Sequence, residues 1–144
     1  MHKEAAKKYI DVLLDNVFHI FSQQFGVNHA EHVFIEIVKI IQDHPSLKAH
    51  LLTLIENTLN VDDVYLYYLK ERPKNFVTGE LIEYLAHAFR WTELLDLAQK
   101  RKIRRFGQDA DPERSSDIAD GIIEALSDDW ADKDFYRSFS ELDH

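Results

Sequence analysis

The chain of 144 residues contains no cysteine. This excludes a disulfide scaffold, a thiolate metal site and a cysteine nucleophile. With only three prolines and four glycines, the chain is neither collagen-like nor of low complexity. The glycines are scattered at positions 26, 79, 107 and 121, so they form no glycine-rich phosphate-binding loop.

Long apolar runs are also missing, because no segment reaches the roughly 18 residues that a membrane-spanning helix requires. The N-terminal residues lack the apolar stretch of a secretory signal peptide. We therefore expect a cytoplasmic protein with no membrane partner.

Motifs that carry a reaction are scarce as well. The sequence has no Gly-x-Ser-x-Gly nucleophile elbow and no His-Glu-x-x-His metalloprotease motif. No residue is singled out as catalytic and no cofactor is implied, so we expect a protein that is not an enzyme.

What the sequence does contain is helical periodicity, with apolar residues recurring every three or four positions along most of the chain. The pattern predicts seven to eight helices. Asn28 followed by Glu31 matches a capping box that would begin the second helix. Residues 62–71 are rich in strand-forming valine and tyrosine, but the helical surroundings favour a helix there too.

A weak internal repeat appears when residues 51–72 are aligned with residues 81–102, an offset of 30. Leu51 then matches Leu81, and Ile55 matches Leu85. Stacked helical hairpins repeat with periods of this order. We predict a single all-α domain over residues 1–144, with antiparallel helical hairpins stacked as a HEAT-like array or packed as an irregular bundle.

The net charge of −9 is unevenly distributed along the chain. Residues 1–106 contain 14 basic and 14 acidic side chains, whereas residues 107–144 contain 3 basic and 12 acidic ones. The net charge therefore belongs to the C-terminal part, which we predict to be an acidic helical pair. An acidic chain of this kind argues against nucleic acid as a partner.

The acidic residues of the C-terminal part follow helical spacing. Like charges four residues apart each cost a few tenths of a kcal/mol, and nothing in the fold requires them. Three interpretations stay open: a solvated face, a face covered by the basic run Lys100–Arg105, and a docking surface for a basic partner. The face consists of Glu113, Asp117, Asp120, Glu124 and Asp128.

The basic run itself has two further explanations. Its cations fall in the last turns of a predicted helix, where they stabilise the negative end of the helix dipole. They could also bind phosphates or an acidic partner. Trp130, between acidic pairs, is either an exposed interface anchor or a residue that packs the last helix onto the core.

One metal-like pattern exists, formed by His29, His32 and Glu36. Their spacing places them on one helix face, and imidazoles with a carboxylate are ligands of zinc or non-haem iron. Lys39 beside them is a poor neighbour for a divalent cation. A metal-binding protein or metal-dependent enzyme is therefore an alternative, and a solvated helix face is the simpler explanation.

These observations favour a non-catalytic binding protein that docks a basic protein through its acidic C-terminal face. Small size, acidity and the absence of a reaction motif suit an inhibitor or immunity-type protein that neutralises a basic nuclease toxin. A helical-repeat adaptor that binds a peptide through exposed tyrosines among residues 65–68 is a further alternative. The residues predicted to bind the partner are Asp117, Asp120, Glu124, Asp128, Asp129 and Trp130.

Overall fold

The computed structural model describes residues 3–107 and 117–140. These residues form α-helices and one short 3₁₀ helix and contain no β-strand, which confirms the all-α prediction. The helices are α1 (Lys3–Ser22), α2 (Val27–Asp43), α3 (Leu47–Leu59), α4 (Gly79–Phe89), α5 (Thr92–Phe106), α6 (Ile118–Ala125), η2 (Ala131–Phe135) and α7 (Arg137–Ser140).

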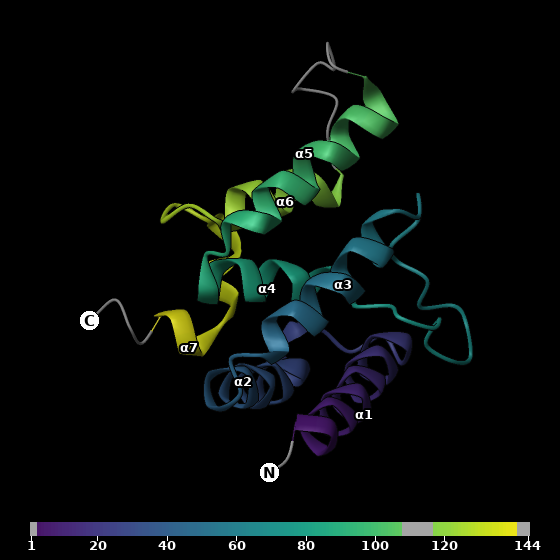
Figure 1. The fold of residues 1–144 in the computed structure, drawn as a ribbon, viewed down its shortest axis with the longest axis vertical. Helices are drawn as coiled ribbons and strands as arrows, with labels where there is room; N and C mark the ends of the chain where they lie inside the picture. The colour runs from purple at the N-terminus through teal and green to yellow at the C-terminus, as the bar shows by residue number, and fades with distance from the viewer. Residues whose placement is uncertain (1–2, 108–116, 141–144) are drawn as a thin grey trace.

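The helices pack as an antiparallel bundle that is longer in one direction than in the others (Figure 1). The pair α1 and α2 lies at one end, the pair α5 and α6 lies at the other, and α3 and α4 lie between them. Helix α4 contacts both α2 and α6, while α3 contacts both α1 and α5. The segment η2 and α7 returns from α6 towards α2, so the acidic C-terminal part is fastened to the rest of the bundle.

The core consists of the apolar faces that the periodicity predicted. On α1 the buried positions include Ile10, Leu14 and Val17, spaced by four and three residues. Helix α4 is buried on most of its surface, as its place in the middle of the bundle requires. Fully burying one such aliphatic side chain contributes about 1.5–3 kcal/mol, so these faces supply the main driving force for the fold.

The helix predicted for residues 62–71 does not form, and that prediction is wrong. After α3 the chain runs as irregular turns up to α4. The side chain of Asp63 accepts a hydrogen bond from the backbone N–H of Tyr65 at 2.9 Å, a local bond that competes with helix formation. The ring of Tyr67 packs against Phe18 and Phe21 of α1, with ring centroids 5.9 and 5.4 Å apart. Packing against α1 thus holds this segment in an extended path.

Because that helix is missing, residues 51–72 are one helix followed by irregular turns, whereas residues 81–102 are two helices. The helix contacts among the described residues are consistent with an antiparallel bundle. The chain after α6 forms η2 and α7. Glu113 lies outside the described residues, and the single-domain assignment stays a prediction.

The predicted capping box at Asn28 and Glu31 is also wrong. Helix α2 begins at Val27 with Gly26 at the N-cap, two residues earlier than an N-cap at Asn28 predicts. The carboxylate of Glu31 accepts the backbone N–H groups of Arg137 and Ser138 at 3.0 and 2.8 Å. A long-range contact has replaced the local one, and it anchors the start of α7 to α2.

Candidate functional site

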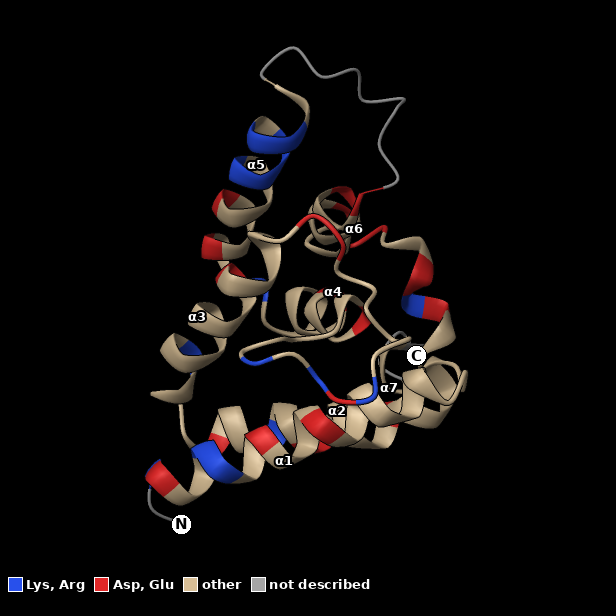
Figure 2. Ribbon diagram, turned by 90° about the vertical axis from the view of Figure 1, so that its right-hand side faces the viewer, with Lys and Arg blue, Asp and Glu red and all other residues tan. Residues whose placement is uncertain are grey.

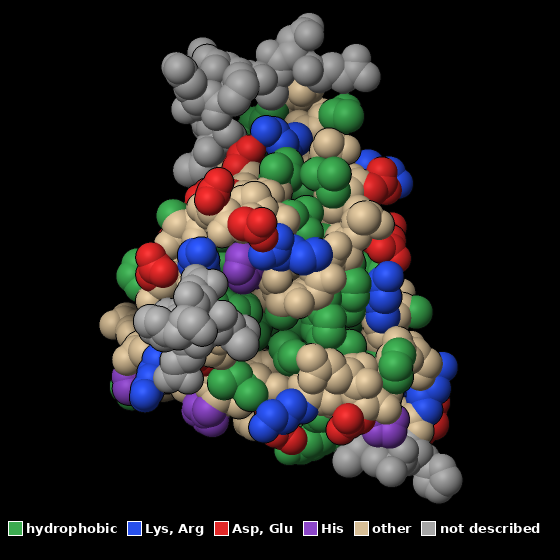
Figure 3. All heavy atoms as spheres, turned by 90° about the vertical axis from the view of Figure 1, so that its left-hand side faces the viewer, with side chains coloured by type: hydrophobic (Ala, Val, Ile, Leu, Met, Phe, Trp, Pro, Cys, Tyr) green, Lys and Arg blue, Asp and Glu red, His purple; other side chains and the backbone are tan. Residues whose placement is uncertain are grey.

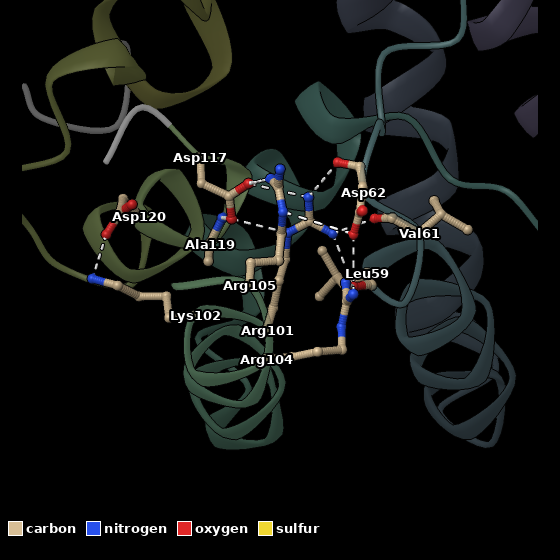
Figure 4. A network of polar contacts seen from close by, with 10 residues as sticks. All are labelled: Leu59, Val61, Asp62, Arg101, Lys102, Arg104, Arg105, Asp117, Ala119 and Asp120. Atoms are coloured by element: carbon tan, nitrogen blue, oxygen red, sulfur yellow. Dashed lines mark hydrogen bonds and ion pairs between the residues drawn. The ribbon is translucent and has the colours of Figure 1, made fainter. Parts of the chain in front are cut away.

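Asp117, the N-cap residue that precedes α6, is buried in an ion pair with Arg101 of α5 (Figure 4). Nε and Nη2 of the guanidinium donate to the two carboxylate oxygens at 2.9 and 3.1 Å. The two side chains are only 1% and 4% exposed, for Arg101 and Asp117 respectively. Asp117 also caps α6 by accepting the N–H of Ala119 at 3.1 Å. The pair therefore fixes where α6 begins.

The same guanidinium holds the C-terminal end of α3. Arg101 donates to the backbone carbonyl of Leu59 and to that of Asp62, each at 2.8 Å, and also to the carbonyl of Val61. All five N–H groups of an arginine are engaged in this way. We call Arg101 with Asp117 and these three carbonyls the Arg101 hub. It joins α3, α5 and α6.

The neighbouring cations of α5 are paired within the chain as well (Figure 4). Lys102 donates to Asp120 at 2.7 Å, Arg105 to Asp117 at 2.6 Å, and Arg104 to Asp62 at 3.0 Å. Among the interpretations of the basic run, pairing with acidic residues of the same chain is the one that these contacts support. Asp117 and Asp120 consequently face α5.

The arginines change the ionisation of the carboxyl groups that they contact. Burial alone would raise the pKa of Asp117, but the hydrogen bonds from Arg101, Ala119 N–H and Arg105 outweigh it and lower that pKa. On the exposed side of the network, the hydrogen bond from Arg104 lowers the pKa of Asp62. Both groups are therefore carboxylates at neutral pH.

The later acidic residues lie in different surroundings. They are exposed on the end of α6, on the turn after it and on η2. Asp128 is 95% exposed even though it pairs with Arg90 at 3.1 Å, and Glu124 accepts the N–H of Ala131 at 3.3 Å. Figure 2 shows these acidic residues around α6 and the segment that follows it. We call the exposed set the acidic rim, and it consists of Glu124, Asp128, Asp129, Asp132 and Asp134.

Trp130 lies beneath the acidic rim and is only 2% exposed. Its ring stacks on Tyr136 at 5.7 Å and lies 5.0 Å from the ring of His87 on α4. Nδ1 of His87 is 2.8 Å from the carbonyl oxygen of Ala125, at the end of α6. Of the two interpretations of Trp130, packing of the last segment onto the core is the one observed. Its aromatic contacts give the acidic rim a packed support.

Sequence reasoning missed Glu83, a half-buried carboxyl on α4 that faces α6. A Cβ atom at position 121 would overlap Oε1 of Glu83, so any other residue there would require this side chain to move. Burial, together with the charges of Asp132, Glu80 and Glu124, raises the pKa of Glu83 to about 8. The available signal was Gly121 itself, because a glycine inside a helix often marks a close approach.

The metal-like pattern on α2 does not assemble into a site. His29 and His32 are exposed, and the ring of His29 lies 4.8 Å from that of Phe25. Across residues 3–107 and 117–140, no group of three histidine, aspartate or glutamate side chains could hold a metal ion. Together with Glu36, these histidines therefore form no ligand set in this structure.

The tyrosines of the irregular segment line a shallow hollow against α1. Tyr67 is half-buried and Tyr68 is 77% exposed. Together with His19 and Lys70 they border a hollow of about 320 Å³. This is the part of the described chain that matches the predicted aromatic peptide surface.

The fold and these contacts define an all-α helical-bundle protein with an internally paired α5–α6 junction and an exposed acidic rim. No protein-family model, no curated protein and no solved structure matches the chain. Within the described residues, no helix is both long enough and apolar enough to cross a membrane.

Proposed function

We propose that this protein binds a basic protein partner through the acidic rim and has no catalytic activity of its own. The observation that carries the proposal is the exposure of five carboxylates within residues 124–134. Repulsion between like charges costs free energy, and neutral polar residues would solvate the same surface equally well. A cationic partner turns this repulsion into attraction and associates faster for it.

The surroundings of the acidic rim support a docking role. Phe135, at the end of η2, is 66% exposed directly beside Asp134. An exposed aromatic ring within a charged surface is typical of an interface anchor. The burial of Trp130 and Tyr136 behind the same segment keeps it ordered before binding, which lowers the entropic cost of association.

The face drawn in Figure 3 carries acidic and basic side chains next to one another around an apolar area. Within residues 124–134, in contrast, five acidic side chains stand against one basic side chain, Lys133. Selectivity for a basic partner is therefore expected of the acidic rim, and an inhibitor or immunity-type protein that blocks a basic nuclease toxin is the most concrete form of the proposal.

The test compares two charge-reversal variants with the wild-type chain as baits in native lysate. The rim variant is Asp129→Lys/Asp134→Lys, and the control is Asp43→Lys/Glu56→Lys, which reverses two exposed carboxylates on α2 and α3. We expect one basic protein to bind the wild-type and control chains stoichiometrically, to be released by salt, and to bind the rim variant at least tenfold more weakly. Equal retention by all three chains would contradict the proposal.

A second candidate function, peptide binding, rests on the hollow beside Tyr68. Its aromatic wall and its lysine would suit an extended peptide with an acidic residue. The variant Tyr68→Ala should abolish capture of such a peptide from a random peptide library while the rim variant retains it. Identical peptide selections with both variants would exclude the hollow as the binding site.

A further inference from the structure

Glu83 occupies an unusual position between the bundle core and the acidic rim. Its carboxyl group lies against the backbone of Gly121, at the contact between α4 and α6. The rim residue Glu124 belongs to α6, and Asp132 belongs to η2, which packs against α6. Glu83 is therefore the buried neighbour of two exposed rim carboxylates.

The groups that act on Glu83 come from each packed element, and they are acids or phenols. Glu80 lies one turn earlier on α4, Glu124 is on α6 and Asp132 is on η2. Burial is the main cause of the raised pKa values of Tyr65 and Tyr136, and the charge of Glu83 contributes to them. None of the ion pairs formed among the described residues includes Glu83.

The carboxyl groups beside Glu83 have other partners. Tyr67 donates a hydrogen bond to Glu80, and Ala131 N–H donates to Glu124. The nearby cations have partners as well: Lys133 of η2 donates to the carbonyl of Asp128 at 3.3 Å, and Arg90, at the end of α4, contacts Asp128 and the carbonyl of Leu126. Carboxylates gathered without a compensating cation cannot all ionise. Burial raises the pKa of both Glu80 and Glu83, but only Glu80 receives a hydrogen bond that favours its carboxylate, so Glu83 is the group that keeps its proton.

We propose that docking of a cationic partner on the acidic rim expels the proton of Glu83, so that binding and deprotonation are coupled. The inference rests on the proposed function, because it needs a cation near Glu124 and Asp132. In the coupled step the carboxyl O–H bond of Glu83 breaks, the proton passes to the buffer, and the carboxylate remains. The partner's positive charge compensates the new negative charge.

The coupling has a definite sign. The pKa of Glu83 in the free protein is about 8, and a nearby cation lowers it. Binding therefore releases protons, and affinity rises with pH between the pKa of the complex and that of the free protein. Outside this window Glu83 no longer makes the affinity change with pH.

The experiment uses an N-acetylated lysine decapeptide as the cationic probe, because its side-chain ammonium groups stay charged throughout the window. Titration calorimetry at low salt and pH 7.5, in buffers of different protonation enthalpy, counts the protons released by the wild-type chain and by Glu83→Gln. We expect roughly half a proton or more from the wild-type chain and close to none from the variant. Equal proton release by the two chains would overturn the coupling.

Two further measurements separate the possible failures. If the decapeptide binds the wild-type chain no better than it binds Asp129→Lys/Asp134→Lys, the rim is not a cation-docking surface and the proposed function fails. If it binds the rim but Glu83 titrates below pH 5.5 in carboxyl ¹³C NMR of the free protein, only the coupling fails. A midpoint near 8 that falls on adding the decapeptide supports it. Circular dichroism of Glu83→Gln verifies that the variant is folded.

Discussion

The acidic face of the C-terminal part divides into two regions of opposite character. Asp117 and Asp120, near the start of α6, are paired with cations of α5. The residues of the acidic rim, beyond the middle of α6, face solvent. The acidic residues follow the same helical spacing in both regions, but α5 covers only the first region. The position of a neighbouring helix thus decides whether an acidic residue supports the fold or remains available to a partner.

The comparison also shows why the basic run lies where it does. α5 reaches past the end of α3, so its last turns meet both the carbonyls that end α3 and the carboxylate that begins α6 (Figure 4). Arg101 contacts both the end of α3 and the start of α6, and the adjacent cations of α5 add further contacts at this junction. The acidic residues near the start of α6 are thereby neutralised by cations of α5, whereas the acidic rim keeps its negative charge.

The largest expected effect on stability follows from breaking the paired region at Arg101. Arg101→Met removes the buried ion-pair partner of Asp117 and the donor to the carbonyls of Val61 and Asp62, and we expect a loss of about 3–5 kcal/mol. Urea unfolding at pH 7 measures it. Lys100→Met is the matched control, because Lys100 is the exposed neighbour of Arg101 and forms an exposed ion pair with Asp96, four residues earlier on α5.

The control should change the free energy of unfolding by less than about 0.5 kcal/mol. If Arg101→Met were within about 1 kcal/mol of Lys100→Met, the Arg101 hub would not be the structural centre of the paired region. Arg101→Lys adds a graded test, since it keeps the charge but loses the fork of donors. We expect it to fall between the two.

The next largest effect concerns Glu83, at the boundary between the regions. Its pKa is raised from 4.5 to about 8 in the folded chain, so the native state binds the proton more tightly than the unfolded state does. The stability that this group contributes is complete below pH 4.5 and is lost as the pH rises through 8. Glu83→Gln should therefore be more stable than the wild-type chain at pH 9, by on the order of 2–4 kcal/mol.

The same variant should match the wild-type chain closely at pH 4.5, where the carboxyl and the amide are both neutral. Urea unfolding of both chains at the two pH values gives the difference. A stability gain that is independent of pH would indicate that the amide packs better than the carboxyl group. It would contradict the raised pKa assigned to Glu83.

Helix existence was predictable because local periodicity determines it, and the all-α class follows from that. The irregular path of the segment after α3 was not predictable, because the position of Tyr67 is set by aromatic rings on α1. Glu31 was misassigned for a related reason, since its backbone partners at Arg137 and Ser138 are more than a hundred residues away. Long-range contacts override local signals wherever the two compete.

The candidate site shows the same limit. The spacing of the acidic residues revealed a face, and the sequence left open whether the basic run covers it. Which carboxylates are covered depends on the three-dimensional path of α5 across the end of α3, and no single-sequence pattern encodes that path. The role of Glu83 depends on the absence of a side chain at Gly121, which becomes meaningful only once α4 and α6 are known to touch.

The smallest expected effect on stability belongs to the exposed region. Asp129→Lys/Asp134→Lys changes two exposed side chains that make no ion pair among those found in the described residues. We expect the free energy of unfolding to change by no more than about 0.5 kcal/mol, and to increase if relief of repulsion dominates. Thermal unfolding of the variant and of Asp43→Lys/Glu56→Lys, measured side by side at low salt, provides the comparison.

The value of this result lies in its combination with binding. A variant that loses the basic partner while its stability is unchanged separates recognition from folding, which no substitution at Asp117 can do because that residue caps α6 and pairs with Arg101. If instead the rim variant were destabilised by more than about 1.5 kcal/mol, the exposed carboxylates would be structural. Both regions of the acidic face would then support the fold, and they would differ only in how much they contribute to stability.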